Sequence, residues 1–208
     1  MNRRNYAKEL KRIIERNGDE KPSVLLHCCC GPCATSVLEF ISKYFDVTVF
    51  WYNPNIFPEN EYEKRFNTLT EVIEKLSLSD TVKIIAEPWR HEEYIACAEG
   101  FEDEKEGGPR CTQCFKLRLS ETAKRAKENG FDYFCSTLTV SRHKNAELIN
   151  TIGEELAEKY NVLWLPSDFK KNNGENRSVE LSEEFKIYRQ LYCGCEFSLD
   201  ARNKPKSE

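Results

Sequence analysis

Short apolar runs alternate with longer amphipathic stretches along most of the chain. The runs are rich in β-branched and aromatic residues, as in Asp-Val-Thr-Val-Phe-Trp-Tyr at 46–52, and turn signals such as Asn-Pro-Asn close them. Between the runs, apolar residues recur at helical spacing, as in Tyr6, Leu10 and Ile13. Because strands and helices alternate, we expect parallel strands joined by right-handed crossovers. The sequence therefore predicts an α/β protein with an open parallel sheet of about five strands and helices on both faces.

The boundaries of these elements follow from the turn signals. We expect strands at 21–26, 46–52, 82–86, 132–139 and 162–165. We expect helices at 4–17, after residue 33, at 59–76, at 91–98, after residue 114, at 144–160 and at 182–191. An acidic loop at 99–106 and a basic loop at 170–177 interrupt this alternation.

Length and composition indicate a single domain. The chain has 208 residues, so we expect one α/β domain at 1–200 with a cysteine-rich C-terminal extension, and a frayed tail at 201–208. We expect neither a membrane span nor a secretory signal, since no long apolar segment is present. We therefore expect a cytoplasmic, reducing location, in which ten cysteines serve metal or redox chemistry. The net charge of -4 argues against a generally basic nucleic-acid-binding protein, but it allows a local basic face.

The strongest chemical signal is Cys-Cys-Cys-Gly-Pro-Cys at 28–33, directly after an apolar run at 24–26. In an open α/β sheet, the turns that follow the strands line the crevice where ligands bind. Gly31 and Pro32 predict a rigid turn that directs the flanking sulfurs toward one point. A single free Cys is often a small buried hydrophobe, but four thiols within six residues favour a thiolate site.

A second cysteine motif follows the acidic loop. Cys111 and Cys114 have the spacing with which two sulfurs bind one metal ion or cluster from a single turn. Together with two of Cys29, Cys30 and Cys33, they would complete a four-thiolate shell. The spacing fits Zn²⁺ and an iron-sulfur cluster equally well. A structural zinc site that ties the loop to the sheet is the alternative.

The third motif is Cys193-Gly194-Cys195. A disulfide across one intervening residue would be strained and easily reduced, which suits an electron carrier better than a structural crosslink. The alternatives are two further metal ligands or a free thiol pair in a turn.

Other residues are weaker candidates. Cys28, Cys97 and Cys135 fit the core better than a ligand set. Asp168 closes the fifth strand, where it could act as an acid or a hard metal ligand, or simply cap a helix. Several basic residues that follow strands four and five could form a rim that meets phosphates: Arg142, Lys144, Lys170, Lys171 and Arg177.

Taken together, these motifs resemble the QueH family of epoxyqueuosine reductases. The resemblance runs from about residue 22 to 198 and rests on the stretches 27–33, 52–56, 107–118, 137–141, 143–145, 167–171 and 188–195. It implies the last step of queuosine synthesis, the removal of the epoxide oxygen from epoxyqueuosine in the anticodon loop of tRNA. The implied fold is similar to that of the adenine-nucleotide hydrolases, with the cysteine turn in place of their phosphate-binding loop.

The resemblance also implies roles for the cysteines. It implies a redox-active disulfide between Cys193 and Cys195, and it leaves Cys33 to bind a second metal ion, iron or zinc, or to tighten the turn. It implies a 4Fe-4S cluster on two matching pairs, Cys29 with Cys30 and Cys111 with Cys114.

The chemistry of the implied reaction suggests how these groups share the work. Opening an epoxide to an alkene requires two electrons, and a proton for the departing oxygen. The cluster would carry single electrons, the Cys193/Cys195 dithiol would carry a pair, and a metal ion or Asp168 would stabilise the developing alkoxide. The expected partners are a tRNA that carries epoxyqueuosine and an electron donor that the sequence does not identify. The competing hypotheses are a zinc-stabilised RNA-binding module and a thiol-disulfide oxidoreductase.

Overall fold

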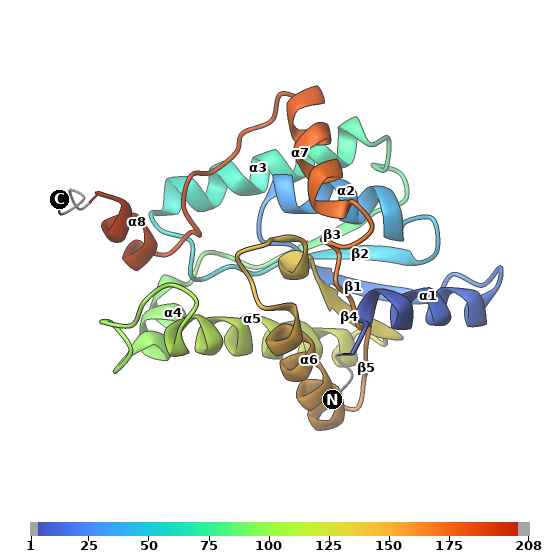
Figure 1. Cartoon of the computed structure of the whole chain (residues 1–208), viewed down its shortest axis with the longest axis horizontal. Coiled ribbons are helices and arrows are strands. Elements are labelled where there is room, and N and C mark those ends of the chain that lie inside the picture. The colour runs from blue at the N-terminus through green and yellow to red at the C-terminus, as the bar shows by residue number, and fades with distance from the viewer. Residues whose placement is uncertain (1–3, 204–208) are drawn as a thin grey trace.

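A five-stranded parallel sheet forms the centre of the structure, a computed structural model that describes residues 4–203 (Figure 1). The strand order is β3-β2-β1-β4-β5. The strands are β1 (Ser23–His27), β2 (Asp46–Trp51), β3 (Lys83–Ala86), β4 (Tyr133–Ser136) and β5 (Leu163–Trp164). β1 is central and pairs in parallel with β2, with Ser23 opposite Asp46, and with β4, with Val24 opposite Tyr133. The predicted open parallel sheet is confirmed.

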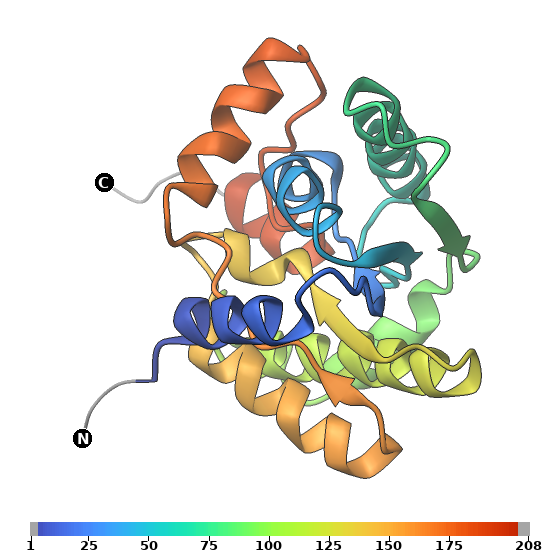
Figure 2. The same ribbon diagram turned by 90° about the vertical axis from the view of Figure 1, so that its right-hand side faces the viewer.

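Helices cover both faces of this sheet. They are α1 (Tyr6–Asn17), α2 (Gly31–Ile41), α3 (Glu59–Lys75), α4 (His91–Ala98), α5 (Pro109–Glu128), α6 (Ala146–Tyr160), α7 (Gly174–Glu184) and α8 (Glu196–Asn203). Figure 2 shows α2, α3 and α7 on one side of the sheet and α5 and α6 on the other. The layers agree with the helices on both faces that the alternation of elements predicts.

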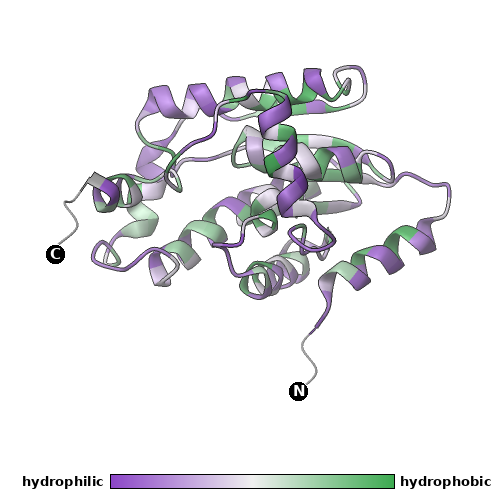
Figure 3. Cartoon of the chain, turned by 45° about the horizontal axis from the view of Figure 1, so that its top comes forward, coloured by the Kyte–Doolittle hydropathy of each residue, from purple (hydrophilic) through white to green (hydrophobic). Residues whose placement is uncertain are grey.

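Two hydrophobic cores follow from the alternation of side chains along β1. Leu26 faces the core that α2 and α3 cover, and Leu25 faces the core under α5 and α6. Since both faces are buried, the strand reads as the continuous apolar run 24–26 rather than as an alternating pattern. Figure 3 shows the matching pattern on the helices, where hydrophilic and hydrophobic bands alternate. Within residues 4–203, no helix has both the length and the apolar composition that a membrane crossing requires.

The carboxyl ends of β1 and β4 mark the point where the chain changes direction across the sheet. β1 leads into α2 on one face, whereas the helix after β4, α6, lies on the other face. His27 at the end of β1 pairs with Ser136 at the end of β4, so the turns that follow these two strands emerge side by side. In an open α/β sheet, this switch point opens the crevice in which ligands bind.

The end of the fourth strand differs from the expectation. β4 stops at Ser136, and Thr137–Val140 forms a 3₁₀ turn instead of extending the strand to residue 139. The Ser136 hydroxyl accepts a hydrogen bond from the backbone N–H of Leu138 at 3.2 Å, which stabilises the tighter turn.

The C-terminal third also differs from the expectation. The helix expected at 182–191 is wrong, because α7 starts at Gly174, inside the expected basic loop, and ends at Glu184. Lys186 has a φ of 53°, and the N–H of Ile187 bonds to the carbonyl of Ser182 at 3.2 Å, as in a Schellman motif. Residues 201–203, expected in a frayed tail, belong to α8, and the rest of that tail, 204–208, lies outside the described residues.

Candidate functional site

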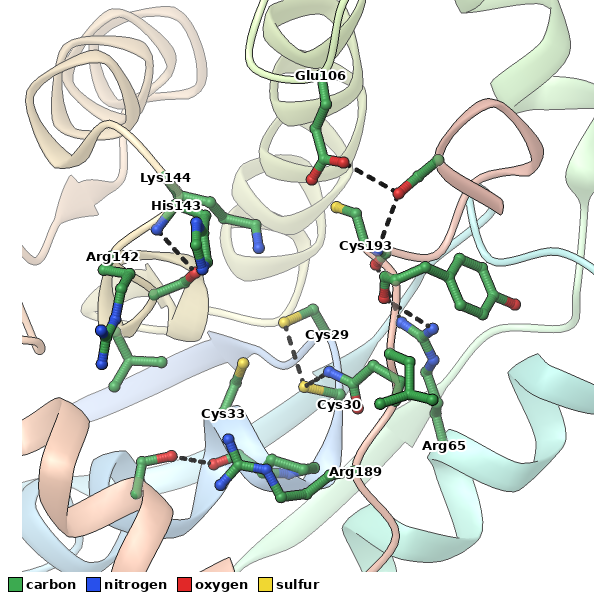
Figure 4. Close-up of a pocket in the computed structure, with 18 of the residues that line it drawn as sticks. Cys29, Cys30, Cys33, Arg65, Glu106, Arg142, His143, Lys144, Arg189 and Cys193 are labelled. Carbon is green, nitrogen blue, oxygen red and sulfur yellow. Dashed lines mark hydrogen bonds between the residues drawn. The ribbon is translucent and has the colours of Figure 1, made fainter. Parts of the chain in front are cut away.

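Three thiols of the turn after β1 converge. The sulfur atoms of Cys29, Cys30 and Cys33 all lie within 4.8 Å of one another (Figure 4). Cys30 directly precedes α2, and Cys33 lies in its first turn. Thiols at this separation can bind one metal ion or one face of a metal cluster. We refer to them below as the thiol triad.

Close packing of two helices explains the glycine in this turn. A Cβ atom on Gly31 would lie 2.6 Å from the Thr68 methyl group and 2.9 Å from the Thr68 carbonyl oxygen. α2 could therefore not approach α3 at this point with any larger residue. Pro32 follows in the first turn of α2, where its missing N–H is not needed.

A buried polar network fixes the strand ends beneath the triad. His27 Nδ1 lies 2.9 Å from the Ser136 hydroxyl, and its Nε2 lies 3.2 Å from the Tyr52 carbonyl oxygen. Burial lowers the pKa of His27 to about 4, so the ring stays neutral at physiological pH. Asn53 donates a hydrogen bond to the carbonyl oxygen of Cys28 at 2.8 Å. The network ties the ends of β1, β2 and β4 together and sets the direction of the cysteine turn.

The contacts within the triad distinguish its members. Hydrogen bonds from the Cys30 and Cys33 thiols hold the pKa of Cys29 well below that of an ordinary thiol, and the charge of Lys144 acts in the same direction. Their hydrogen bonds to Cys29 raise the pKa values of Cys30 and Cys33. Cys29 is therefore the first of the three to become a thiolate, the form that binds metal.

The triad opens into a cavity of about 740 Å³ at the carboxyl ends of the strands, which we call the thiol cavity. Cys193 from the C-terminal extension and Arg118 from α5 line the same cavity. Figure 4 shows the Lys144 side chain reaching toward the space between Cys29 and Cys193. Residues from the first turn and from the end of the chain thus face one space.

Arg65 of α3 holds the C-terminal turn in place. Its guanidinium donates to the carbonyl oxygens of Cys193 at 3.0 Å and Tyr192 at 3.3 Å, while its Nε pairs with Glu61 at 2.7 Å. The Arg65 side chain is only 2% exposed. A buried, fully engaged guanidinium of this kind orients the chain that it contacts.

Gly194 meets two steric demands of the same turn. Its φ of 140° lies in the region that favours glycine, and a Cβ atom would lie 3.1 Å from Arg65 Nη1 and 3.2 Å from Asn55 Nδ2. The backbone N–H of Cys193 donates to the Ser198 hydroxyl at 3.2 Å, and that hydroxyl donates to Glu106 at 3.0 Å. These contacts present the Cys193 sulfur to the thiol cavity.

Cys195 occupies a different environment from Cys193. It is buried and packs with Cys114, Tyr94 and Ala98 in a small apolar cluster, with Cys97 at its border. Burial raises the pKa of Cys195, and a hydrogen bond with the Tyr94 side chain partly offsets this effect. Cys193 thus faces the cavity, and Cys195 lies behind it near the second cysteine motif.

Cys111 and Cys114 do not belong to the group of sulfurs that converge in the triad. The Cys111 sulfur accepts a hydrogen bond from the N–H of Gly107 at 3.2 Å and packs on the same core as Cys29. Burial raises the pKa of Cys111 and Cys114, and the nearby sulfur of Cys193 raises it further. Joint metal binding by Cys29, Cys30, Cys111 and Cys114 therefore stays a prediction.

Asp168 lies outside the thiol cavity. It lines a neighbouring cavity of about 600 Å³ and forms an ion pair with Lys170. Four of the five residues expected to form a basic rim line this second cavity, which we call the basic cavity: Arg142, Lys144, Lys170 and Lys171. The fifth, Arg177, pairs with Glu39 elsewhere. Arg142, His143 and Lys144 line both cavities and thus form a shared wall.

The remaining cysteines and several polar groups complete the site. Cys28 and Cys135 are fully buried, as expected for core residues. Gln190 was not predicted from the sequence, and it donates a hydrogen bond to the Cys30 sulfur at 3.1 Å. Gln190 lies in the stretch 188–195 that carries the family resemblance, but nothing in the sequence indicated its contact with Cys30. No sequence signal pointed to Arg65, since it acts across a long sequence distance. Arg118 did have a signal, because it follows Cys111 by seven residues and so shares its helix face.

The fold and the site define a class of protein: a doubly wound α/β protein with clustered thiols at its switch point. A sequence model of the family described as epoxyqueuosine reductase QueH matches residues 24–201. The chain belongs to this family of oxidoreductases.

Relatives from several bacteria carry the same description. The protein of Streptococcus pyogenes serotype M1 is 45% identical over 198 residues, which covers 93% of this chain and 78% of that protein. The Staphylococcus epidermidis protein is 44% identical, with 93% of this chain and 84% of that protein covered. The Thermotoga maritima protein is 37% identical, with 89% and 95% covered. Each is described as epoxyqueuosine reductase QueH.

A solved structure supports the fold. The U34-tRNA thiolase NcsA from Methanococcus maripaludis, determined with its [4Fe-4S] cluster, superposes with a TM-score of 0.53. The match covers 93% of this chain and 68% of that one at 14% sequence identity. At such low identity the likeness shows the fold alone.

Proposed function

We propose that this chain is an epoxyqueuosine reductase, which removes the epoxide oxygen of epoxyqueuosine in tRNA to give queuosine. Membership of the family supports the reaction and the substrate. One structural observation supports it most directly: the thiol triad and Cys193, remote in sequence, line a single cavity at the switch point of the sheet.

The donor set suits an iron-sulfur cluster. Soft thiolates are the ligands that such clusters prefer. Cys29 and Cys30 line the thiol cavity, and Cys111 and Cys114 lie at the start of α5, the helix whose Arg118 lines the same cavity. When bound, a 4Fe-4S cluster would supply electrons one at a time. Cys33 would bind a second metal ion, iron or zinc, or serve the triad itself. The ligands for the cluster would be Cys29, Cys30, Cys111 and Cys114.

The C-terminal pair supplies what the reduction consumes. Oxidation of the Cys193 and Cys195 thiols to a disulfide releases two electrons and two protons. Conversion of an epoxide to an alkene takes up two electrons and two protons and releases the oxygen as water, so the two half-reactions balance. Cys193 faces the cavity and would contact the substrate, while Cys195 lies behind it as the second thiol of the pair. An external electron donor would then restore the dithiol.

The basic cavity fits the phosphates that flank a modified nucleotide. It adjoins the thiol cavity along Arg142–Lys144, so a base that enters the thiol cavity would leave its backbone near Lys170 and Lys171. Asp168 reaches the departing oxygen only if the substrate extends across this shared wall, and its proton-donor role stays a prediction. Affinity for tRNA should fall as salt rises; an affinity that does not depend on salt would contradict phosphate contacts.

Anaerobic purification followed by iron, sulfide and zinc analysis tests the proposal. We expect a coloured protein with iron and acid-labile sulfide that converts epoxyqueuosine in tRNA to queuosine, as read by nucleoside mass spectrometry. A colourless, zinc-containing protein that binds tRNA without converting it would favour the RNA-binding module. Reduction of protein disulfides without action on tRNA would favour the thiol-disulfide oxidoreductase.

A further inference from the structure

Arg118 is a buried cation that has no carboxylate partner among the described residues. Its side chain is 2% exposed, and only its Nε is hydrogen-bonded there, to the carbonyl oxygen of Cys114 at 3.2 Å. The other buried arginines among the described residues, Arg65 and Arg110, have more of their donors engaged, although Arg110 Nε also lacks a partner. Arg65 pairs with Glu61, and Arg110 donates to two backbone carbonyls at 3.1 and 2.7 Å. Since an uncompensated buried charge is strongly destabilising, Arg118 requires an anion that the carboxylates do not supply.

The geometry indicates what that anion is. Cys111, Cys114 and Arg118 recur at helical spacing on one face of α5, so the guanidinium lies one turn beyond the second cysteine motif. Arg118 also lines the thiol cavity with the triad and Cys193. The sulfur atoms of Cys114, Cys29 and Cys193 lie close enough to interact electrostatically with the guanidinium.

Lys144, in the loop before α6, repeats this arrangement. Its ammonium makes no ion pair with any residue between 4 and 203, and it points toward the space between Cys29 and Cys193 (Figure 4). The sulfur atoms of Cys193, Cys29 and Cys33 lie close enough to interact electrostatically with it. Two cations, one from α5 and one from the loop before α6, therefore lie near the sulfur atoms of Cys29 and Cys193.

We propose that Arg118, assisted by Lys144, balances the negative charge of the thiolate-bound centre and sets its reduction potential. This inference rests on the cluster assigned under the proposed function. A 4Fe-4S core held by thiolates is an anion that becomes more negative when it accepts an electron, so nearby positive charge favours the reduced form. Arg118 is thus a positioning residue for electron transfer rather than a group that contacts the substrate.

A redox titration of the cluster, followed by electron paramagnetic resonance, tests this role. In Arg118→Met the midpoint potential should shift to more negative values by about 60 mV, which corresponds to a tenfold lower ratio of reduced to oxidised cluster at a given potential. Arg118→Lys keeps the charge and should recover most of the shift. Lys116→Met removes an exposed charge from the same helix and should leave the potential unchanged.

Each outcome has a clear meaning. If the wild-type protein contains no iron and sulfide, the proposed function fails before this inference is reached. If the wild-type protein holds the cluster and Arg118→Met titrates at the same potential, the inference alone is overturned. If Arg118→Met does not assemble a cluster, Lys144→Met decides: a smaller negative shift supports the inference, and an unchanged potential overturns it. A weaker affinity for tRNA at an unchanged potential would instead assign both cations to the substrate and overturn it.

Discussion

The two cysteine turns that line the thiol cavity are built in opposite ways. The turn at 28–33 lies between a central strand and a helix, and its direction follows from its own flanking elements. The turn around Gly194 lies at the end of an irregular segment, 185–195, and depends on groups from elsewhere in the chain. The chief ones are the Arg65 guanidinium and the backbone N–H of Phe57, which donates to the Gly194 carbonyl at 2.9 Å.

The two turns therefore differ in what holds them in position. The triad turn is held by the backbone hydrogen bonds of the parallel sheet together with the polar network beneath it, so a single side-chain change should move it little. The C-terminal turn is held by a few contacts, chiefly those of Arg65, Phe57 and Ser198, so the loss of the Arg65 guanidinium should affect it more. We therefore expect the metal centre to be robust and the C-terminal thiol pair to be sensitive to distant substitutions.

The largest expected effect concerns the thiol that the C-terminal turn presents. Cys193→Ser should retain the iron and sulfide content but reduce turnover on epoxyqueuosine tRNA by roughly 100-fold or more, because the electron pair can no longer be stored. Cys97→Ser is the matched control. Cys97 lies at the border of the small apolar cluster that contains Cys195, and this variant should stay active. Undiminished turnover in Cys193→Ser would remove the redox role of the pair.

The second-largest effect is expected for Arg65, which holds the C-terminal turn in place. Arg65→Met should lower the free energy of unfolding by about 3 kcal/mol, since it breaks a buried ion pair and leaves two carbonyl groups without their donor. Turnover should fall while the iron content of the folded protein is unchanged, and urea denaturation with metal analysis measures both. Lys64→Met alters the exposed neighbour and should cost far less. Loss of iron in folded Arg65→Met would show that the two turns are not independent.

The polar network beneath the triad should give a smaller effect, which concerns the metal centre instead of the C-terminal turn. Asn53→Ala leaves the Cys28 carbonyl and His27 Nε2 without their side-chain partner, which should lower the free energy of unfolding by about 2 kcal/mol. Because this network sets the direction of the triad turn, the cluster should be lost faster to a chelator than in the wild type, as followed by absorbance. A chelation rate equal to that of the wild type would argue that the strands alone fix the turn.

The smallest effect serves as a control at the other end of the sheet. Asp132 accepts hydrogen bonds from the N–H and hydroxyl of Ser23 at 2.8 and 2.7 Å, and these bonds lower its pKa. A carboxyl group whose pKa falls on folding stabilises the protein above its unfolded pKa of about 3.9 and loses this effect as the pH falls. Asp132→Ala should therefore reduce stability by about 1 kcal/mol at pH 7 and less near pH 3. Urea titrations at both pH values test this, and a difference that grows in acid would contradict it.

The periodicity of the sequence predicted the sheet because the strands that form it are buried on both faces. Residues 24–26 and 46–52 read as strands without any knowledge of their neighbours. The errors arose where tertiary contacts override periodicity. Ile187 and Tyr188 continue a helical pattern, yet the positive φ of Lys186 ends α7 and leads the chain over α3, where the Tyr188 hydroxyl bonds to Glu61 at 2.9 Å.

The candidate site was predictable where one short segment holds its own chemistry. The cysteine motifs are visible in the sequence alone, and the sulfur atoms of Cys29, Cys30 and Cys33 do lie close together in the structure. The support of the site was not predictable, because Arg65 reaches Cys193 across more than a hundred residues. Asp168 is a different case: its position at the end of a strand suggested chemistry, its side chain pairs with Lys170 in the basic cavity, and its chemical role stays a prediction.

The most direct measurement is the iron and sulfide content of three anaerobically reconstituted variants, Cys111→Ser, Cys114→Ser and Cys33→Ser. We predict that the first two lose the cluster, while Cys33→Ser retains it. Full iron and sulfide in both Cys111→Ser and Cys114→Ser, with loss in Cys33→Ser, would contradict the account and confine the metal centre to the thiol triad.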